Sequence, residues 1–443
     1  MFDYFTGRLK ENMGRRERKR TTKKKSLTHA IHLDCDPIFI KLKQWMTTYK
    51  WQTENKLRIA LFSNTGRGVV SLKTLKVGDT LVQVPYDLMI TFTTLQTLFV
   101  QSVLTSYSLL QMQDLLSVFI ILERHKGASS QWKPYIDSLP DDTPDLPWLS
   151  HSHEINALPN KLQVALIKRR ESFELSWERL KKSINSNWKC ECCQIPGNRV
   201  ITLNSFTWAY VMVNTRAVYI DPNIVRELST ESLKHVLSDE PCMALCPYLD
   251  MFNHSNKAKN EVNLVKINGK WVYELTTLSG SIKHREVFIS YGSHDNFKLL
   301  CEYGFFIPNN ELDLVRLDFD EVLKISEIKL NQKQYRFIKM RKFDESLYVD
   351  RSGMSFNLKA VFFVMLNPSL TDWCFRIFSD YLKDDLVQMD ELLKNILKWE
   401  SLQIESVLKS SGHGFYSENF KLIVKYLNYQ LNVINELIVK GIS

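Results

Sequence analysis

The chain has 443 residues, of which 44% are hydrophobic and 24% are charged, and its formal net charge at pH 7 is +9. This size and composition are typical of a globular protein with two or three packed units. The longest apolar run near a predicted helix, Leu115-Leu116 and then Val118–Leu122, is far shorter than the roughly eighteen residues that span a bilayer. With no apolar stretch suited to a signal peptide, the composition excludes a membrane-spanning protein and predicts a soluble intracellular one.

The positive charge is concentrated at the N-terminus. Residues 1–25 contain ten Lys and Arg residues and three acidic ones, a net charge of +7 that leaves +2 for the remaining 418 residues. The runs Arg15–Arg20 and Lys23–Lys25 are typical of a nuclear-import or nucleic-acid-binding segment, although a solvated tail without such a role has the same composition. We expect a basic disordered tail over residues 1–35, nucleosomes as a candidate partner of this tail, and a location in nucleus and cytoplasm.

The first predicted elements are one helix and three short strands. Helical spacing relates Phe39, Leu42, Trp45 and Met46. Strand-like segments separated by turns rich in Asn and Gly follow at Leu57–Phe62, Gly68–Ser71 and Asp79–Pro85.

From about residue 95 to residue 240 the pattern becomes helical. One helix is indicated by Leu115, Leu116, Phe119, Ile120 and Glu123, and a longer one by Leu158, Leu162, Leu166, Phe173, Trp177 and Leu180. Strands return at Glu261–Val265, Lys270–Leu275 and Glu286–Ser290. Beyond about Asp318 the chain is helical again, with apolar faces formed by Leu382, Leu386, Met389, Leu393 and Leu397 and by Phe420, Ile423, Val424, Leu427, Leu431, Ile434 and Leu437.

These blocks predict an α+β fold in which a helical insertion splits a small β unit and a helical C-terminal domain follows. The expected boundaries are 36–94 and 245–308 for the two β parts, 95–244 for the insertion and 318–443 for the C-terminal domain. The eight cysteines, scattered from Cys35 to Cys374, do not form a secreted disulfide framework, so reduced thiols are expected.

Three motifs follow one another in the second β part: Asp250–Ser255, Val287–Gly292 and Glu302–Phe305. In this order and spacing they resemble the signature of the SET domain, a family that transfers a methyl group from S-adenosylmethionine to a protein side chain. The split β core and helical C-terminal domain are similar to the Rubisco large-subunit methyltransferase class of that family. The resemblance runs from about Lys41 to the C-terminus, with further matches at Asn64–Gly68, Trp132–Tyr135 and Val213–Tyr219. It implies a SET-type β fold and a C-terminal domain that binds the protein substrate.

The resemblance also implies which residues bind S-adenosylmethionine, namely Thr65, Gly66, Arg67, Gly68, Arg216, Asn253, His254 and Tyr291. The Thr65–Gly68 loop matches a loop whose main chain contacts the cofactor, because glycines allow a close backbone approach. The Asn253-His254 pair matches residues around the adenine, and Arg216 matches an arginine that pairs with the cofactor's carboxylate. By themselves, these residues are equally compatible with an ordinary glycine turn, a buried hydrogen-bonded pair and a surface salt bridge.

Two tyrosines carry the implied catalysis. Tyr291 matches the catalytic tyrosine, whose hydroxyl can hydrogen-bond the acceptor nitrogen and whose ring can help hold a cationic sulfonium. Tyr303, twelve residues later, matches a second aromatic residue of the lysine channel, and Asp250 matches a position near the substrate lysine. Most tyrosines are core residues with a satisfied hydroxyl, so the assignment depends on the paired spacing.

Methyl transfer to lysine needs a neutral amine aligned with the methyl donor. Alignment alone can contribute on the order of 7–11 kcal/mol. A free lysine has a pKa of about 10.4 and is mostly protonated at neutral pH, but an apolar aromatic channel disfavours the ammonium by desolvation. The reaction requires no metal.

The sequence departs from the family pattern in two places. Many SET domains have a glycine turn before the strand that leads to Tyr291, but here that turn reads Lys283–Glu286. The cysteine-rich zinc segment of many histone-directed members is absent, since only Cys374 follows Phe305. The cluster Cys190–Cys193 in the insertion has no second ligand group at zinc-finger spacing, so we expect loop cysteines and no metal.

The sequence therefore predicts a protein-lysine N-methyltransferase that uses S-adenosylmethionine, acts on histone or non-histone proteins and is a monomer without membrane contact. One alternative is a catalytically silent SET fold that serves as a binding scaffold. Another is a histidine methyltransferase, because a related branch of the class methylates histidine on actin. Direct nucleic-acid binding rests on residues 1–25 alone.

Overall fold

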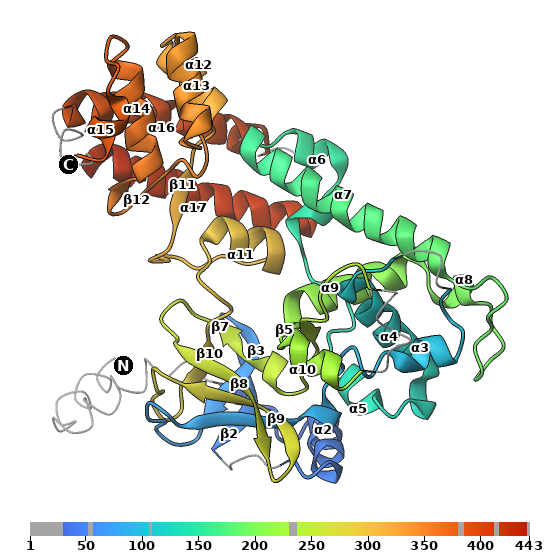
Figure 1. Ribbon diagram of the computed structural model, residues 1–443. Helices are drawn as coiled ribbons and strands as arrows, with labels where there is room; N and C mark the ends of the chain where they lie inside the picture. The colour runs from blue at the N-terminus through green and yellow to red at the C-terminus, as the bar shows by residue number, and fades with distance from the viewer. Residues whose placement is uncertain are drawn as a thin grey trace, which may run out of the picture. The chain divides into compact units, whose positions relative to one another are not determined.

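The computed structural model describes residues 30–51, 56–105, 109–229, 237–379, 385–411 and 416–440 (Figure 1). Residues 1–29 of the tail expected over 1–35 and the predicted helix position Leu382 lie outside the described residues, whereas Ile31 and His32 form a strand paired with Leu57–Phe62. Contacts divide the chain into two compact units, the first comprising Met1–Met89 and Cys246–Ser290 and the second Ile90–Leu245 and Tyr291–Ser443. Each unit is therefore assembled from two segments that are separate in the sequence.

The first unit contains a five-stranded sheet of order β1-β2-β3-β10-β7. Its strands are β1 (Ile31–His32), β2 (Leu57–Phe62), β3 (Gly66–Ser71), β7 (Asn253–His254) and β10 (Glu286–Ile289). Strand β10 pairs antiparallel with β3, Glu286 opposite Val70, and parallel with β7, Phe288 opposite Asn253. Strand β10, which belongs to the second segment of the unit, therefore pairs with β3 of the first segment and with β7 of its own segment.

A second sheet in this unit has the order β4-β9-β8 and is antiparallel throughout. Its strands are β4 (Thr80–Pro85), β8 (Asn260–Ile267) and β9 (Lys270–Thr277), and the short helices η1 (Tyr86–Leu88) and η5 (Leu249–Met251) flank the segment ends. The turn between β8 and β9 is Asn268-Gly269. Both residues have a positive φ, which is the backbone conformation preferred in two-residue hairpin turns.

Helix α2 (Pro37–Thr48) begins where the sequence predicts it. The Asp36 side chain accepts a hydrogen bond from the N–H of Ile38, and Pro37 occupies the first helical position, where its missing N–H is not needed. Phe39, Leu42 and Met46 form the buried face.

The turn before β10 forms without glycine. The carbonyl of Ile282 accepts from the N–H of Arg285, and His284 between them has a φ of 60°. This left-handed conformation costs a residue with a Cβ roughly 1–2 kcal/mol. The His284 side chain is exposed, so the chain bears a backbone strain that a glycine would relieve.

The second unit begins with the helices of the insertion. These are α3 (Gln96–Val100), α4 (Met112–Lys126), η2 (Gly127–Ser129), α5 (Lys133–Ile136), η3 (Pro147–Leu149), α6 (Ser152–Asn156), α7 (Asn160–Ser183), α8 (Gly197–Val200), α9 (Leu203–Arg216) and α10 (Pro222–Glu227). Short strands β5 (Val218–Tyr219) and β6 (Met243–Ala244) pair with each other. Helix α4 is buried along almost its whole length and packs on α9.

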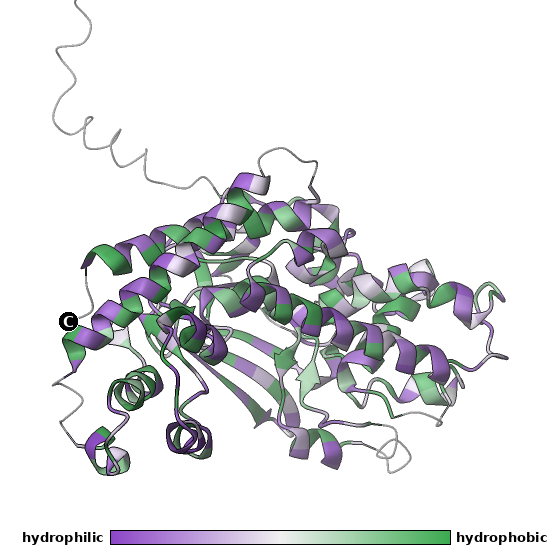
Figure 2. Cartoon of the chain, turned by 90° about the horizontal axis from the view of Figure 1, so that it is seen from above, coloured by the Kyte–Doolittle hydropathy of each residue, from purple (hydrophilic) through white to green (hydrophobic). Residues whose placement is uncertain are grey.

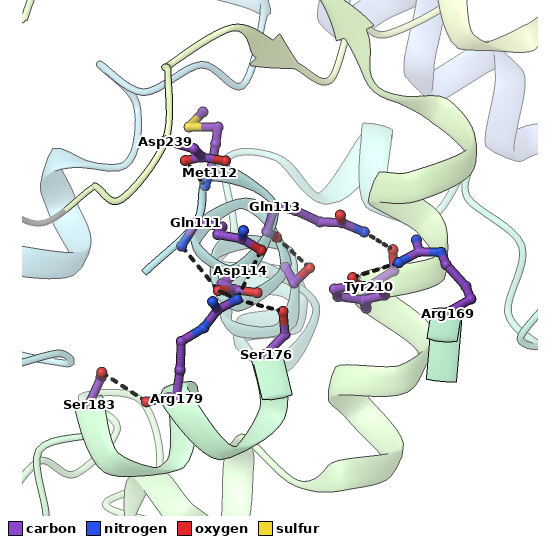
Figure 3. Close-up of polar contacts among 11 residues, drawn as sticks. Gln111, Met112, Gln113, Asp114, Arg169, Ser176, Arg179, Ser183, Tyr210 and Asp239 are labelled. Carbon is purple, nitrogen blue, oxygen red and sulfur yellow. Dashed lines mark hydrogen bonds and ion pairs between the residues drawn. The ribbon is translucent and has the colours of Figure 1, made fainter. Parts of the chain in front are cut away.

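Helix α4 is held to α7 at its first turn (Figure 3). The Asp114 carboxylate accepts from the N–H of Gln111 at 3.0 Å and lies 3.4 Å from the Arg179 guanidinium of α7. Asp239 accepts from the N–H of Met112 at 2.8 Å. Burial raises the pKa of Asp114, and the Gln111 N–H and the Arg179 charge oppose that rise.

The rest of the second unit holds the C-terminal elements. They are α11 (Asn296–Tyr303), β11 (Leu314–Arg316), α12 (Phe319–Ser326), α13 (Gln332–Met340), β12 (Tyr348–Asp350), β13 (Gly353–Met354), α14 (Phe356–Leu366), α15 (Trp373–Ile377), α16 (Leu386–Ser410) and α17 (Glu418–Lys440). The order β11-β12-β13 forms a small antiparallel sheet. The C-terminal part is mostly helical, as predicted, and its strands were not expected because two or three residues are too short to show an alternating pattern.

Helices α16 and α17 pack on each other, and hydrophobic and hydrophilic positions alternate along the helices as the sequence predicts (Figure 2). Their buried positions include Met389, Leu393 and Leu397 in α16 and Ile423 and Leu427 in α17. Among the described residues, no helix combines the length and apolar character needed to cross a membrane.

Because His284 has a positive φ and an exposed side chain, we expect His284→Gly to leave stability unchanged or to raise it by up to about 1 kcal/mol. The control Lys283→Gly, in the same turn but at an ordinary φ, should lower stability by about 0.5–1 kcal/mol, since it only adds freedom to the unfolded chain. Urea unfolding of both variants checks this. A loss from His284→Gly as large as that from Lys283→Gly would contradict the strain.

Candidate active site

The Thr65–Gly68 segment begins at the hairpin turn between β2 and β3. Gly66 is the first residue of β3, opposite Phe62, and has a φ of 72°, a conformation that disfavours residues with a side chain. The Thr65 hydroxyl donates to both carboxylate oxygens of Glu286 on β10, at 2.9 and 2.7 Å. The turn is thereby fixed to a strand from the second segment of the unit.

Asn253 binds the same carboxylate. Its side-chain Nδ2 donates to Glu286 Oε1 at 2.8 Å and to the main-chain oxygen of Arg67 at 2.8 Å. Burial raises the pKa of Glu286, while the hydrogen bonds from Asn253 and Thr65 oppose that rise. Glu286 thus connects two of the sequence-predicted cofactor positions, although no pattern in its own segment singles it out beyond the missing glycine nearby.

Gly68 is required for space rather than for its backbone angle. A Cβ at this position would lie 2.5 Å from Glu286 Oε1 and 2.8 Å from Asn253 Nδ2. Both distances are well below van der Waals contact, so any side chain here must displace the Glu286 network. The Arg67 side chain points elsewhere, with its guanidinium 5.8 Å from the centre of the Phe39 ring.

The Asn-His motif runs beside the strand that ends the first unit. His254 is buried and pairs with Ile289, and its Nε2 lies 2.7 Å from Asn256 Oδ1. The N–H of Ser255 donates to the carbonyl of Ile289 at 3.0 Å. Asp250 lies in η5, just before this motif, and its charge adds to burial in raising the pKa of Cys246.

Tyr291 and Tyr303 lie together in the second unit. Their ring centroids are 5.3 Å apart with an interplanar angle of 37°, and both residues are partly buried. His294 and Phe305 lie 5.9 and 6.2 Å from the Tyr303 ring. Burial, and then the Glu302 carboxylate, raises the pKa of Tyr303, so its phenol is neutral at pH 7.

His294 is the titratable member of this aromatic cluster. Burial, and then the positive charge of Lys298, lowers its pKa below the ordinary value. Its imidazole is therefore neutral at pH 7, and the cluster as a whole presents aromatic rings without a cation.

Arg216 ends helix α9, and a partly buried arginine, Arg169, connects the end of that helix to α11. Arg169 of α7 donates from Nη2 to Asn214 Oδ1 at 2.6 Å, and from Nε to Glu302 Oε2 at 3.1 Å. Asn214 in turn donates to the main-chain oxygen of Glu302 at 2.7 Å. The remaining nitrogen of Arg169 donates to the Tyr210 hydroxyl at 3.0 Å (Figure 3).

This network acts on both neighbouring site residues. Asn214 lies two residues before Arg216, and Glu302 lies directly before Tyr303. Arg169 is partly buried, and its three polar partners compensate its guanidinium. Arg169 was not a sequence candidate, because nothing in its own segment distinguishes it from the other basic residues of a long helix.

Gly304 ends α11 with a φ of 74°, and a Cβ there would lie 2.3 Å from the carbonyl oxygen of Asp145. The glycine that follows Tyr303 therefore serves both as a helix cap and as a close contact with the segment before η3.

The structure thus places the predicted residues in two groups. Six of them surround or adjoin Glu286 in the first unit, namely Thr65, Gly66, Arg67, Gly68, Asn253 and His254. In the second unit, Tyr291 and Tyr303 are in ring contact, and Arg216 lies at the end of a helix tied to the Tyr303 helix. Their roles in binding and catalysis remain predictions.

We expect Gly68→Ala to lower stability by about 1–3 kcal/mol, because the new methyl group displaces Glu286 and Asn253. Glu286→Ala should then cost less in the Gly68→Ala background than in the wild type, since the same network is already broken. The control Gly78→Ala, at a positive φ with open space around it, should be additive with Glu286→Ala. A urea-unfolding double-mutant cycle measures both couplings, and additivity at Gly68 would overturn the proposed contact.

Sequence comparison finds relatives that share most of the chain. SET domain-containing protein 4 of Artemia parthenogenetica is 29% identical over 402 residues, covering 89% of this chain and 95% of that protein. The Homo sapiens protein of the same name is 30% identical over 324 residues, covering 72% of this chain and 70% of that protein. No protein-family model matches the sequence.

More remote relatives carry names of enzymes. A ribosomal lysine N-methyltransferase of Schizosaccharomyces pombe is 26% identical over 38% of this chain and 37% of its own length. An actin-histidine N-methyltransferase of Gallus gallus is 24% identical over 67% of this chain and 47% of its own length.

Solved structures confirm the predicted SET-type fold. The SET domain of LSMT bound to lysine and AdoHcy has a TM-score of 0.54 at 17% identity, and Rubisco LSMT bound to AdoMet has 0.53 at 18% identity. Each likeness covers 91% of both chains. Together with the sequence identity to the human and Artemia proteins, the motifs and the fold establish that this chain belongs to the SET domain-containing protein 4 family.

Proposed function

We propose that this protein transfers a methyl group from S-adenosylmethionine to a lysine side chain of another protein. The observation that carries the proposal is the contact between Tyr291 and Tyr303, whose ring centroids lie 5.3 Å apart. Two neighbouring tyrosines can position an amine by hydrogen bonding and exclude water around it.

The residues of the predicted cofactor set fit S-adenosylmethionine. At Gly66 a Cβ would meet no atom within 4 Å, so the main chain of this turn has an open side that a ligand can approach. We propose that the Thr65–Gly68 backbone, Asn253 and His254 bind the nucleoside part. The Arg216 guanidinium suits the amino-acid carboxylate, because arginine binds carboxylates through paired charge-assisted hydrogen bonds. When bound, the cofactor supplies the methyl group.

The aromatic cluster favours lysine as the acceptor. Lysine must lose a proton before it can attack, and partly buried rings disfavour the ammonium form. After transfer, a methylated ammonium remains attracted to the faces of Tyr291 and Tyr303. The lysine and histidine methyltransferases among the relatives make histidine the alternative acceptor.

We further propose, from the sequence of residues 1–25, that the protein enters the nucleus as well as the cytoplasm. Histones, nucleosomes and non-histone proteins are therefore all candidate substrates, and the first assay includes each of them.

Tyr291→Phe should reduce methyl transfer by about 100-fold or more, because it removes the hydroxyl that positions the acceptor nitrogen. The assay uses labelled S-adenosylmethionine with core histones, nucleosomes and a hypomethylated cell lysate. The matched control Tyr335→Phe, at a tyrosine on α13 that is 45% exposed, should retain full activity. Full activity in Tyr291→Phe would contradict the assigned role.

Two readouts separate the alternatives. S-adenosylhomocysteine should raise the thermal unfolding midpoint of both wild type and Tyr291→Phe, since a ligand that binds only the folded state stabilises it. Absence of both label and thermal shift would instead favour a scaffold without catalysis. Label recovered on histidine after hydrolysis would reassign the acceptor.

The pH dependence of kcat/KM for a peptide substrate also identifies the acceptor. For lysine, we expect a rise of about tenfold per pH unit from pH 7 to pH 9, because the free amine titrates near 10.4. Burial raises the pKa of Tyr303, so ionisation of this phenol should cause no decline within that range. A plateau above about pH 7 would indicate histidine, whose side chain is already neutral there.

A further inference from the structure

Three cysteines and one histidine of the insertion meet in the second unit. The sulfurs of Cys190, Cys192 and Cys193 and a ring nitrogen of His125 all lie within 4.8 Å of one another. His125 Nε2 is 3.1 Å from the Cys193 sulfur, and the sulfurs of Cys190 and Cys192 are 3.0 Å apart. His125 lies 68 residues before Cys193, so spacing along the chain does not reveal it as a further ligand.

The main chain shapes the cysteine loop between α7 and α8. The N–H of Cys190 donates to the carbonyl of Ile195 at 2.9 Å, and the N–H of Gln194 donates back to the carbonyl of Cys190 at 2.8 Å. Gln194 has a φ of 62°, and Lys189 bridges Pro196 at the base of the loop. These contacts close a tight turn that brings the three thiols together, which is how short metal-binding loops present neighbouring ligands.

The histidine comes from a rigid element. His125 lies in the last turn of α4, which ends at Gly127 with a φ of 55°. Helix α4 is largely buried, so the direction of the imidazole toward the loop is set by packing rather than by a flexible segment.

A surface hollow of about 370 Å³ adjoins the cluster. Lys126, Trp188, Cys190 and Cys192 are among its lining residues, and both Cys192 and Cys193 are exposed. The hollow gives an ion access from solvent.

We propose that His125, Cys190, Cys192 and Cys193 bind one zinc ion. Three thiolates and a neutral imidazole are a preferred zinc set, and zinc–sulfur bonds of about 2.3 Å in a tetrahedron place the sulfurs within about 4 Å of each other. On binding, the three thiols release their protons to solvent and the ion keeps its oxidation state. All four positions are filled by the protein, so the site is structural and leaves no open position for catalysis.

The ion would join two parts of the insertion. It connects the end of α4 to the loop that leads through α8 into α9, and α9 packs on α4 and ends at Arg216. Zinc therefore fixes the start of the helix whose other end bears a proposed cofactor residue. Zinc binding can be tested independently of methyl transfer, because the measured quantities are the zinc content and the thermal unfolding midpoint.

The test starts from full-length protein purified under reducing conditions and passed through gel filtration, with metal measured by mass spectrometry. Wild type should contain about one zinc ion per chain, and His125→Ala and Cys193→Ser should lose most of it. His125→Cys should retain zinc, because it replaces one ligand by another. The matched controls Cys35→Ser and His153→Ala, at exposed residues outside the cluster, should keep the wild-type content.

Cobalt substitution distinguishes the loss of a metal ligand from a failure of the variant to fold. Wild-type protein reconstituted with Co²⁺ should show thiolate-to-metal charge-transfer absorption, and His125→Cys should strengthen it by adding a fourth thiolate. A chelator should lower the thermal unfolding midpoint of wild type and leave that of His125→Ala unchanged.

Two results would overturn the proposal. The first is reduced, folded wild-type protein that holds neither zinc nor cobalt after incubation with either ion. The second is a stable disulfide between two of the three cysteines in protein purified under reducing conditions, which would assign the cluster to redox chemistry instead.

Discussion

The Glu286 carboxylate joins the two chain segments that form the first unit, Met1–Met89 and Cys246–Ser290. It accepts hydrogen bonds from Thr65 in the hairpin turn before the insertion and from Asn253 after it, 221 and 33 residues away. Strand β10, which bears Glu286, also lies between β3 and β7 in the sheet. Neither segment alone can complete this sheet or hold the turn at Gly66, so the candidate cofactor site exists only when both have come together.

Two unfavourable features, the raised pKa of Glu286 and the left-handed backbone of His284, lie within three residues of each other. Burial raises the pKa of Glu286 above its ordinary value of 4.5, so the folded state binds a proton there more readily than the unfolded chain does. The contribution of Glu286 to stability therefore falls as the pH rises from its unfolded-state pKa to its folded-state pKa. At higher pH the ionised carboxylate lowers the free energy of unfolding. His284, with its left-handed backbone, lies just before it. Strain and buried charge concentrated beside a candidate binding turn are expected where position matters more than stability.

The sequence was informative where local pattern determines structure. The buried face of α2, the strands β2, β3 and β9 and the helices α4 and α7 were predictable from spacing and turn residues, whereas the motif residues were selected by resemblance. The roles of Arg169, His125 and Glu286 were not predictable, because their contacts are with residues far away in the sequence. Gly68 was selected for its backbone freedom, but the structure shows a requirement for space, since a Cβ there would lie 2.5 Å from Glu286 Oε1.

The helical insertion takes part in organising the tyrosines. Arg169 is partly buried among Tyr210, Asn214 and Glu302, so removing any one partner would leave polar atoms without compensation. Asn214 and Glu302 lie close in sequence to Arg216 and Tyr303, so the same guanidinium links the segments that bear both candidate site residues. Shortening the insertion would therefore change the position of candidate catalytic groups as well as remove surface helices. This coupling gives a physical reason for a β core that is interrupted by helices rather than continuous.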